Sequence, residues 1–454
     1  MLGSSGVRRR LPVAMQNRDF ALLVLATLGT GLATPMIAVA IGWQVYDIHH
    51  RAFDLGLIGL LEFGPVFLLA LPAGALTDRV SRKLMLAGAA LLLAGISAAL
   101  ILVSESGARQ LWPFLALAAG SGVAEALSFP AMRALPPLLV SREELPGALA
   151  LESVVSQAGT VAGPALGGLL FAIHPEITYA TALALFALAA IATLLISLHG
   201  RAPAPTHAVH PIRELLGGIH FIGATPMLLG AILLDLFAVL FGGAVALLPV
   251  FAQTILHVGP FGLGVLRSAP AAGAVIAGLL LIRAPLRTRA GPTLITMVVI
   301  FGASTVVFGL SHWFVLSLAA LVVGGFVDMF SVNIRSTTAT MITPNQVRGR
   351  VGSVEAVFIG ASNQLGAFES GTAAALLGTV PSVVAGGAIT IAIALSWTKL
   401  FPALAKLGRM SELEPADGGH PAEDLTEVPV PIPAGDLASA TPWLTDETNG
   451  PTQP

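Results

Sequence analysis

The chain of 454 residues contains no cysteine and very few charged side chains. The missing cysteine excludes a disulfide framework, a thiolate metal site and a cysteine nucleophile. Charged residues make up 11% of the chain, whereas soluble globular proteins carry about a quarter. Because 55% of the residues are hydrophobic, the polar side chains are too few to cover a globular surface. We therefore expect lipid to be the main solvent of this protein.

The sequence also lacks the usual motifs of soluble chemistry. It has no G-x-x-x-x-G-K-[ST] motif, so the sequence does not support transport powered by ATP hydrolysis in this chain. It has no H-E-x-x-H, G-x-S-x-G or paired histidine cluster, and no folded soluble domain that would indicate a receptor. We therefore expect no enzyme activity, no cofactor, no bound metal and no nucleic-acid partner.

Long apolar runs dominate what remains, and a helix that crosses a bilayer needs ~20 largely apolar residues. In lipid the backbone must satisfy its own hydrogen bonds, which favours helices. The sequence therefore predicts an all-α membrane protein with twelve transmembrane helices. These are expected at about 20–46, 54–77, 84–103, 111–133, 147–172, 177–198, 225–250, 261–282, 292–311, 314–335, 351–378 and 381–401.

The distribution of positive charge tests this topology. Of the 23 Lys and Arg residues, only Arg51, Arg109 and Arg267 fall at the opposite ends of the predicted spans. The positive-inside rule then predicts that both termini are cytoplasmic. Cytoplasmic segments 1–19, 199–224 and 402–454 flank two six-helix bundles, 20–198 and 225–401, and the polar composition of 402–454 predicts disorder.

The two halves repeat one another. Glu62 and Pro65 match Arg267 and Pro270 at a shift of 205 residues, and Arg133 matches Arg335 at a shift of 202. A further set matches at a shift of 203 residues: Glu152, Gly163 and Gly168 with Glu355, Gly366 and Gly371. Near-constant shifts predict two pseudo-symmetric bundles that meet face to face, with a substrate held between them near the midplane.

Two motifs resemble signatures of the major facilitator superfamily. GALTDRVSRK (74–83) is similar to its loop signature G-x-x-x-D-R-x-G-R-[KR], with serine in place of the second glycine, and GTVAGPALGG (159–168) matches G-x-x-x-G-P-x-x-G-G of span five. Longer strings such as FPAMRALPPLLVSREELPGALALES (129–153) resemble its bacterial enterobactin-exporter-like branch. The resemblance covers roughly residues 15–400 and implies a monomeric secondary transporter in a bacterial inner membrane. The stretch LALAAG (115–120) lacks the arginine that many proton-coupled exporters carry in span four.

The loop 74–83 is a candidate cytoplasmic gate. The resemblance places it beside the start of span eleven, where Asp78 would gain ~0.3–1 kcal/mol from the helix dipole. Arg79 or Arg82 would pair there with Glu355. The alternative is that the cations only mark the cytoplasmic side. The candidate gate comprises Gly74, Asp78, Arg79, Arg82, Lys83 and Glu355.

Span five carries glycines at helical spacing around a proline. Such small residues let helix backbones approach closely, and a proline bends the helix. The resemblance places this span against span eight of the other half, where a tight seam would seal the outer gate; the alternative is close packing with no directional role. The motif residues are Gly159, Gly163, Pro164, Gly167 and Gly168.

Several ionisable residues lie near the span centres, where a charge costs at least ~2.5–3.5 kcal/mol. We expect Glu62, Glu125, Asp235, Asp328 and Glu369 to face a cavity, to be paired or to hold a proton. The alternative is a purely structural ion pair or hydrogen bond. Polar and aromatic groups complete the candidate pathway: Arg267, Trp43, Gln44, Asn333 and Asn363.

Together these features predict a secondary transporter for a small molecule. The leading hypothesis is a proton-driven exporter of a hydrophobic drug or siderophore-like metabolite. The alternative is an uptake permease of the same fold. The expected partners are membrane lipid, the small-molecule substrate and protons.

Overall fold

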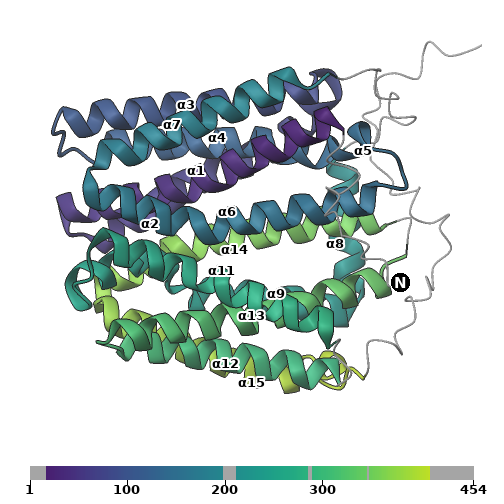
Figure 1. Cartoon of the computed structure of the whole chain (residues 1–454). Helices are drawn as coiled ribbons and strands as arrows, with labels where there is room; N and C mark the ends of the chain where they lie inside the picture. The colour runs from purple at the N-terminus through teal and green to yellow at the C-terminus, as the bar shows by residue number, and fades with distance from the viewer. Residues whose placement is uncertain (1–16, 198–210, 285–288, 345–346, 409–454) are drawn as a thin grey trace, which may run out of the picture. The chain divides into compact units, whose positions relative to one another are not determined.

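The computed structural model describes residues 17–197, 211–284, 289–344 and 347–408, and of residues 70–79, 211–216, 353 and 356 the backbone only. The helices of the first half are α1 (Arg18–His49), α2 (Ala52–Arg79), α3 (Arg82–Glu105), α4 (Trp112–Ala134), α5 (Pro136–Leu139), α6 (Leu145–Ile173) and α7 (Pro175–Leu195). Those of the second half include α8 (Pro211–Ala224), α9 (Pro226–Gly242), α11 (Gly259–Arg283), α12 (Ala290–Leu310), α13 (Phe314–Ile342), α14 (Arg348–Leu377), α15 (Thr379–Leu400) and α16 (Pro402–Ala405). Figure 1 shows the long helices running side by side.

Local sequence explains where these helices start. The side chain of Asn17 caps α1 by accepting hydrogen bonds from the backbone N–H groups of Asp19 and Phe20, which lack partners in the helix. Proline occupies the first turn of α4, α6, α7, α9 and α11. At that place its missing N–H costs nothing and its fixed φ suits a helix.

Eleven of the described helical segments are long and apolar enough to cross a bilayer. The predicted span 351–378 corresponds to α14, which has 30 residues but is not among the eleven. It carries Glu355, Asn363 and Glu369 and packs against α2, α8 and α9. Because α14 lies between the two halves, its polar residues do not need to face lipid.

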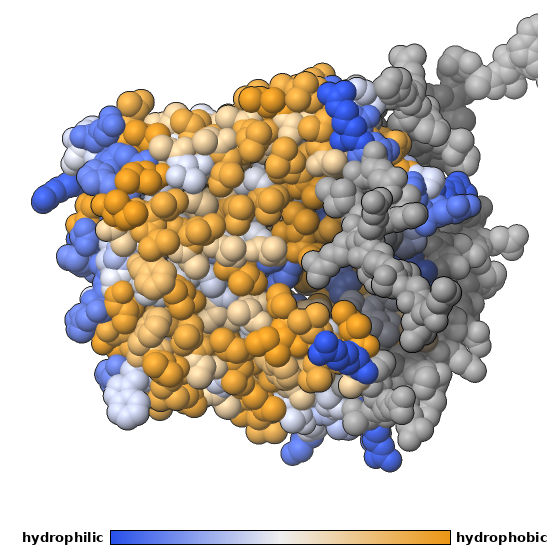
Figure 2. Space-filling view, in the orientation of Figure 1, coloured by the Kyte–Doolittle hydropathy of each residue, from blue (hydrophilic) through white to orange (hydrophobic). Residues whose placement is uncertain are grey.

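The outer surface fits this assignment. Figure 2 shows an apolar belt across the helices, with hydrophilic residues at the two ends. Exposed side chains on this surface include Leu68, Val315 and Ile282, whose exposed fractions are 73%, 75% and 78%. An exposed apolar belt of this kind is stable in lipid and not in water.

The helices form two bundles with matching internal contacts. In the first bundle α1 packs on α6 and α7, α2 on α4, and α3 on α4 and α7. In the second, α11 packs on α13, α12 on α13 and α15, and α9 on α14 and α15. The bundles meet where α6 packs on α11 and α2 packs on α14 (Figure 1). This is the pseudo-symmetric arrangement that the sequence repeat predicts.

The seventh span is broken, although the sequence predicted one continuous helix over 225–250. After α9 ends at Gly242, the chain continues as a 3₁₀ turn, η2 (Ala244–Leu247), the short α10 (Leu248–Val250) and a π-helical turn, η3 (Phe251–Ile255). Hydroxyl groups replace the lost helical partners: Thr305 donates to the Gly242 carbonyl at 3.3 Å and Ser370 to the Gly243 carbonyl at 3.1 Å. Side-chain donors of this kind make an interrupted helix tolerable in a membrane.

Candidate functional site

A cavity of about 730 Å³ lies between the two bundles and extends into the first one. Helices α1, α2, α3, α4, α6 and α7 line it from the first bundle, and the broken seventh span, α11 and α14 line it from the second. Small-molecule sites typically have volumes of about 300–1,000 Å³. The cavity therefore has the size and the position expected of a transport site.

Four of the predicted pathway residues line this cavity: Glu62 of α2, Glu125 of α4, Arg267 of α11 and Asn363 of α14. The Nη1 atom of Arg267 donates to the Ala38 carbonyl at 3.4 Å, so a cation of the second bundle contacts a helix of the first. The ion pairs found within the described part of the chain do not include Arg267. It interacts electrostatically with Glu62, so its charge acts on a carboxyl group of the same cavity.

The two acids lie on helices that are in backbone contact. A Cβ atom on Gly122 of α4 would lie 2.0 Å from the Glu62 carbonyl oxygen, so only glycine permits this approach. Glu125 follows Gly122 by three residues and therefore lies near the same face of α4. The carboxylates of Glu62 and Glu125 are therefore close enough to repel each other when both are charged. One proton or one donor-rich ligand would relieve this repulsion.

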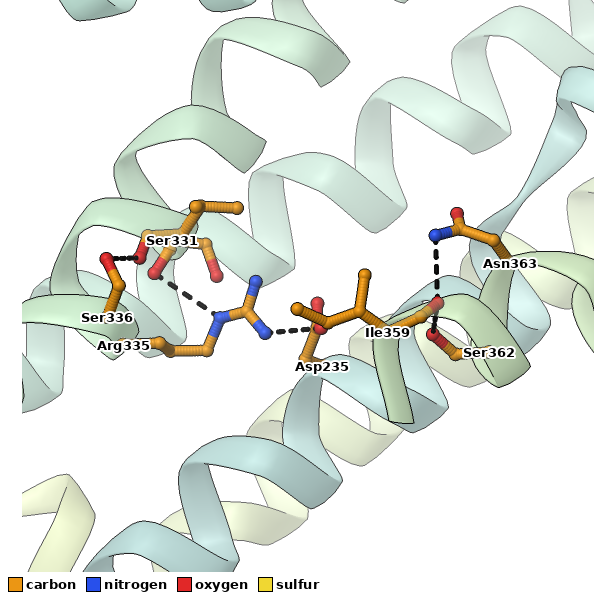
Figure 3. A network of polar contacts seen from close by, with 8 residues as sticks. Asp235, Ser331, Arg335, Ser336, Ile359, Ser362 and Asn363 are labelled. Atoms are coloured by element: carbon orange, nitrogen blue, oxygen red, sulfur yellow. Dashed lines mark hydrogen bonds and ion pairs between the residues drawn. The ribbon is translucent and has the colours of Figure 1, made fainter. Parts of the chain in front are cut away.

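Asp235 and Asp328 belong to a separate charged cluster inside the second bundle. Asp235 of α9 forms an ion pair with Arg335 of α13, and both side chains are buried. Figure 3 shows the two side chains pointing toward one another, with the Arg335 Nε atom donating to the Ser331 carbonyl at 3.4 Å. Asp328 lies two turns before Arg335 on α13 and interacts with it electrostatically.

Glu355 joins the same cluster from α14. It lines a small cavity together with Asp235 and Arg335, and it interacts electrostatically with both. The cluster thus holds three carboxyl groups around one guanidinium. The sequence predicts that Asp235 and Asp328 are paired, protonated or facing a cavity, but it does not identify Arg335 as their partner.

The other predicted pathway residues lie elsewhere. Gln44 accepts a hydrogen bond from the Tyr179 hydroxyl at 2.7 Å and donates to the Ser104 hydroxyl at 3.2 Å. Trp43 is half-buried, and its backbone carbonyl accepts from Gln253 at 3.0 Å. Gln44 and Trp43 therefore stabilise the end of α1.

Two further candidates are half-buried. Asn333 lies on α13, outside the cavity lining described above. Glu369 on α14 accepts a hydrogen bond from the Ser370 hydroxyl at 3.5 Å, next to the break in the seventh span.

The loop 74–83 is described only in part. The side chains of Gly74, Asp78 and Arg79 lie outside the described residues, and the backbone of α2 extends to Arg79. Arg82 donates to the Ala134 carbonyl at 3.5 Å and Lys83 to the Ile196 carbonyl at 2.6 Å. Cations at these positions satisfy carbonyl groups at the ends of α4 and α7, where the helix dipole favours positive charge.

The glycines of span five have two different partners. Cβ atoms on Gly159, Gly163 and Gly167 would lie within 2.5–2.7 Å of atoms of α1, inside the first bundle. Gly168 contacts the second bundle, where a Cβ atom would lie 2.3 Å from the Pro260 carbonyl oxygen and 3.0 Å from Gly264, and the Pro164 carbonyl also lies against Gly264. Most of the motif therefore packs α6 on α1 rather than on the other half.

A second glycine pair repeats the Gly168–Gly264 contact. A Cβ atom on Gly371 of α14 would lie 2.8 Å from the Cα atom of Gly56 on α2. Gly56 and Gly264 each follow the pattern Phe-x-Leu, at 53–55 and 261–263, which is the sequence signal that could have found them. Both pairs lie toward the end of the bundles where α1 finishes at His49, and together they bring the two halves into backbone contact there.

Comparisons with known proteins agree with this geometry. The chain is 28% identical over 375 residues to the Enterobactin exporter EntS of Shigella dysenteriae serotype 1 (strain Sd197), which covers 81% of this chain and 88% of the relative. It is 27% identical to the Enterobactin exporter EntS of Escherichia coli O139:H28, with the same coverage.

Solved transporters share the fold. A bacterial homologue of the human lysosomal transporter Spinster, in an inward-facing and unoccupied conformation, superposes with a TM-score of 0.70 at 15% identity, covering 87% of this chain and 99% of that one. The nucleoside transporter NupG, solved as a single-site mutant, superposes with a TM-score of 0.66 at 14% identity, covering 86% and 100%.

The family model that describes transmembrane secretion effectors matches residues 12–424, which is most of the chain. That match agrees with the two-bundle fold and the cavity between the bundles, and it identifies a membrane transporter rather than an enzyme. The chain therefore belongs to the transmembrane secretion effector family of the major facilitator superfamily.

Proposed function

We propose that this protein exports an amphipathic metabolite or drug in exchange for protons, by alternating access in a bacterial inner membrane. The observation that supports this most is the placement of Glu62 and Glu125 in one cavity with Arg267. Two carboxylates and one guanidinium leave one negative charge to be neutralised. Either a proton or a hydrogen-bond-donating group of the cargo can neutralise it.

Competition between these two occupants is what antiport requires. A proton on Glu62 or Glu125 weakens cargo binding, and by linkage bound cargo weakens proton binding to the same extent. A proton that enters from outside then releases the cargo there. An anionic cargo would behave in the opposite way, because it would bind best with both acids protonated, and it would move together with protons.

The relatives support a siderophore-like cargo, since those reported above carry the name Enterobactin exporter. A catechol-type head group donates hydrogen bonds through its phenol hydroxyls, which suits carboxylate acceptors. We propose a cargo with such a donor-rich head, and a hydrophobic drug with an amine in place of the phenols fits the same cavity. The ends of the helices that carry Arg18 and Arg82 face the cytoplasm in this proposal.

The predicted gate remains part of the proposal. In the present conformation Arg82 contacts the Ala134 carbonyl and Glu355 lies near Arg335. We propose that the loop 74–83 approaches the start of α14 when the cytoplasmic side closes. The glycine pairs at the opposite side, Gly168–Gly264 and Gly56–Gly371, would separate in that step.

Flux measurements test the coupling directly. The full chain is reconstituted in liposomes and transport of propyl gallate, a phenolic amphiphile, is followed with and without an imposed pH gradient. We expect a gradient to drive propyl gallate against the direction of proton flow. The variant Glu62→Gln should lose this stimulation, while Glu105→Gln, at the exposed end of α3, should retain it.

The same experiment can contradict the proposal. Flux that ignores the gradient would exclude proton coupling. Flux in the same direction as the protons would indicate an uptake permease instead of an exporter.

A further inference from the structure

The cavity follows about half of the circumference of α1, with Thr34 between two sets of lining residues. One set faces the second bundle and α6, and it comprises Gly31, Pro35, Ala38 and Gly42. The other set faces into the first bundle and comprises Ala26, Thr30, Ile37 and Ile41. These two sets lie on different sides of a helix with 3.6 residues per turn. The cavity therefore continues around α1 into the interior of the first bundle.

The part of the cavity inside the first bundle, here called the inner branch, has mainly apolar walls, and the hydroxyls of Thr30 and Thr193 there donate to carbonyls of their own helices. Opposite α1 it is lined by Leu86, Ala89 and Leu93 of α3, Ala118 of α4 and Phe186 of α7. Helix α1 packs closely on α6 and α7, and the space on its α3 and α4 side is left to this branch. Apolar cavities exclude water and accept apolar ligands.

The inner branch extends toward the end of the first bundle where α1 begins, since Leu86 of α3 and Thr193 of α7 also line the cavity. Near the start of α1 its walls include the buried alanines Ala26, Ala90 and Ala189. The larger core cluster that contains Ala94, Leu100 and Phe114 lies toward the other end of the bundle. The walls of this branch are therefore formed mainly by small and apolar side chains, which suit an apolar ligand.

The second bundle has no matching branch in the part of the chain that the structure describes. Helices α12 and α15 correspond to α3 and α7 by their packing, and none of their described residues lines the cavity. The second bundle contributes the polar groups Arg267, Asn363 and Gln364 together with apolar side chains of the broken seventh span and α14. One cavity therefore has its charged groups near the contact between the bundles and a mainly apolar region within the first bundle.

We propose that the inner branch binds the apolar part of the cargo, an alkyl chain or aromatic group, while its donor-rich head lies beside Glu62 and Glu125. This inference rests on the proposed function and assigns the first bundle as the part that selects the cargo. The continuity of the branch with the carboxylate region argues for one amphipathic molecule and against an apolar ligand alone. A bilayer lipid tail is the competing occupant that the experiment must separate.

The test uses a homologous series with one head group. Dissociation constants of propyl gallate and octyl gallate are measured for the full chain in lipid nanodiscs, using free ligand concentrations. Each methylene buried in protein contributes about fourfold to affinity, so octyl gallate should bind far more tightly than propyl gallate. Ala89→Phe fills part of the branch and should lower the octyl-to-propyl affinity ratio by about 16-fold, the contribution of roughly two methylenes.

Leu91→Phe is the matched control. Leu91 lies two residues from Ala89 on the other face of α3, with an exposed fraction of 54%, and its substitution should leave the ratio intact. Leu93→Ala enlarges the branch and should raise the chain length at which affinity stops increasing, which keeps the test informative if Ala89→Phe does not fold.

The outcomes separate this inference from the proposed function. An octyl-to-propyl ratio that is unchanged in both Ala89→Phe and Leu93→Ala would overturn the inner branch as the tail site. An equal fall in Leu91→Phe would assign the tail to the lipid-facing surface. If the octyl-to-propyl affinity ratio changes as expected but gallate binding does not compete with protons, the inner branch is supported as the tail site and the proton-coupled mechanism is contradicted.

Discussion

Replacing Arg335 by methionine should destabilise this protein more than any single change at the acids around it. Arg335 forms a buried ion pair with Asp235 (Figure 3) and, among the described residues, is the cation that interacts electrostatically with Asp328 and Glu355. Methionine retains an unbranched apolar stem of similar length, so the change removes the charge with little loss of packing.

The magnitude follows from the charges that remain. Breaking a buried ion pair by removing one partner costs about 3–5 kcal/mol, because the other charge is left uncompensated. Arg335→Met leaves three acids without a cation, which places it in this range. Asp235→Asn leaves Arg335 with two acids and a neutral hydrogen-bonding partner, so we expect a smaller loss of about 1–3 kcal/mol.

Thermal unfolding in detergent measures both losses, and Leu91→Phe serves as a lipid-facing control. The two single variants and the double variant form a cycle whose coupling energy isolates the Asp235–Arg335 interaction. Acid should narrow the gap between Arg335→Met and the wild type, since the acids left without a cation can take up protons as the pH falls. The reasoning is refuted if Asp235→Asn is the more damaging variant or if the gap widens in acid.

Three further predictions follow from contacts described above. Gly264→Leu should force α11 away from α6 and so increase the labelling of a cysteine introduced near their contact, which is possible because the chain has no native cysteine. Gly95→Leu is the control, because Gly95 faces open space and its substitution should leave the labelling unchanged. Tyr179→Phe should lower the unfolding temperature by leaving Gln44 with one partner fewer, a loss of about 1–3 kcal/mol, and unchanged stability would show that this hydrogen bond is unimportant. Glu62→Gln should flatten the pH dependence of propyl gallate binding; a retained pH dependence would assign proton competition to another group.

Much of the fold could be predicted from composition and spacing. Hydropathy is summed along the chain, so the spans, the charge asymmetry and the two-fold repeat are visible without any knowledge of packing. The same reasoning identified span five as a close-packing helix, because glycines at 159, 163 and 167 share one face. It did not identify their partner, which is α1 for most of them.

The candidate site was harder to predict, because the position of an acid within its span does not show whether it faces a cavity or an ion-pair partner. Glu62 and Asp235 have similar positions within their spans, yet one lines the cavity and the other is buried against Arg335. The direction in which a helix faces and the identity of its neighbour decide this difference. The break after Gly242 was also missed, because it depends on hydroxyl donors from α12 and α14 that lie far away in sequence.

The sequence by itself determined that this is a two-bundle membrane transporter, because lipid imposes length, apolarity and charge asymmetry on each span separately. Only the tertiary structure decided which charges meet. Helix packing places Glu62, Glu125 and Arg267 around one cavity. It places Arg335 in a separate cluster with three acids, which are Asp235, Asp328 and Glu355. The tertiary structure also determined the apolar space beside α1. A cavity forms where several packed helices leave a volume unfilled, so it cannot be predicted from any one helix.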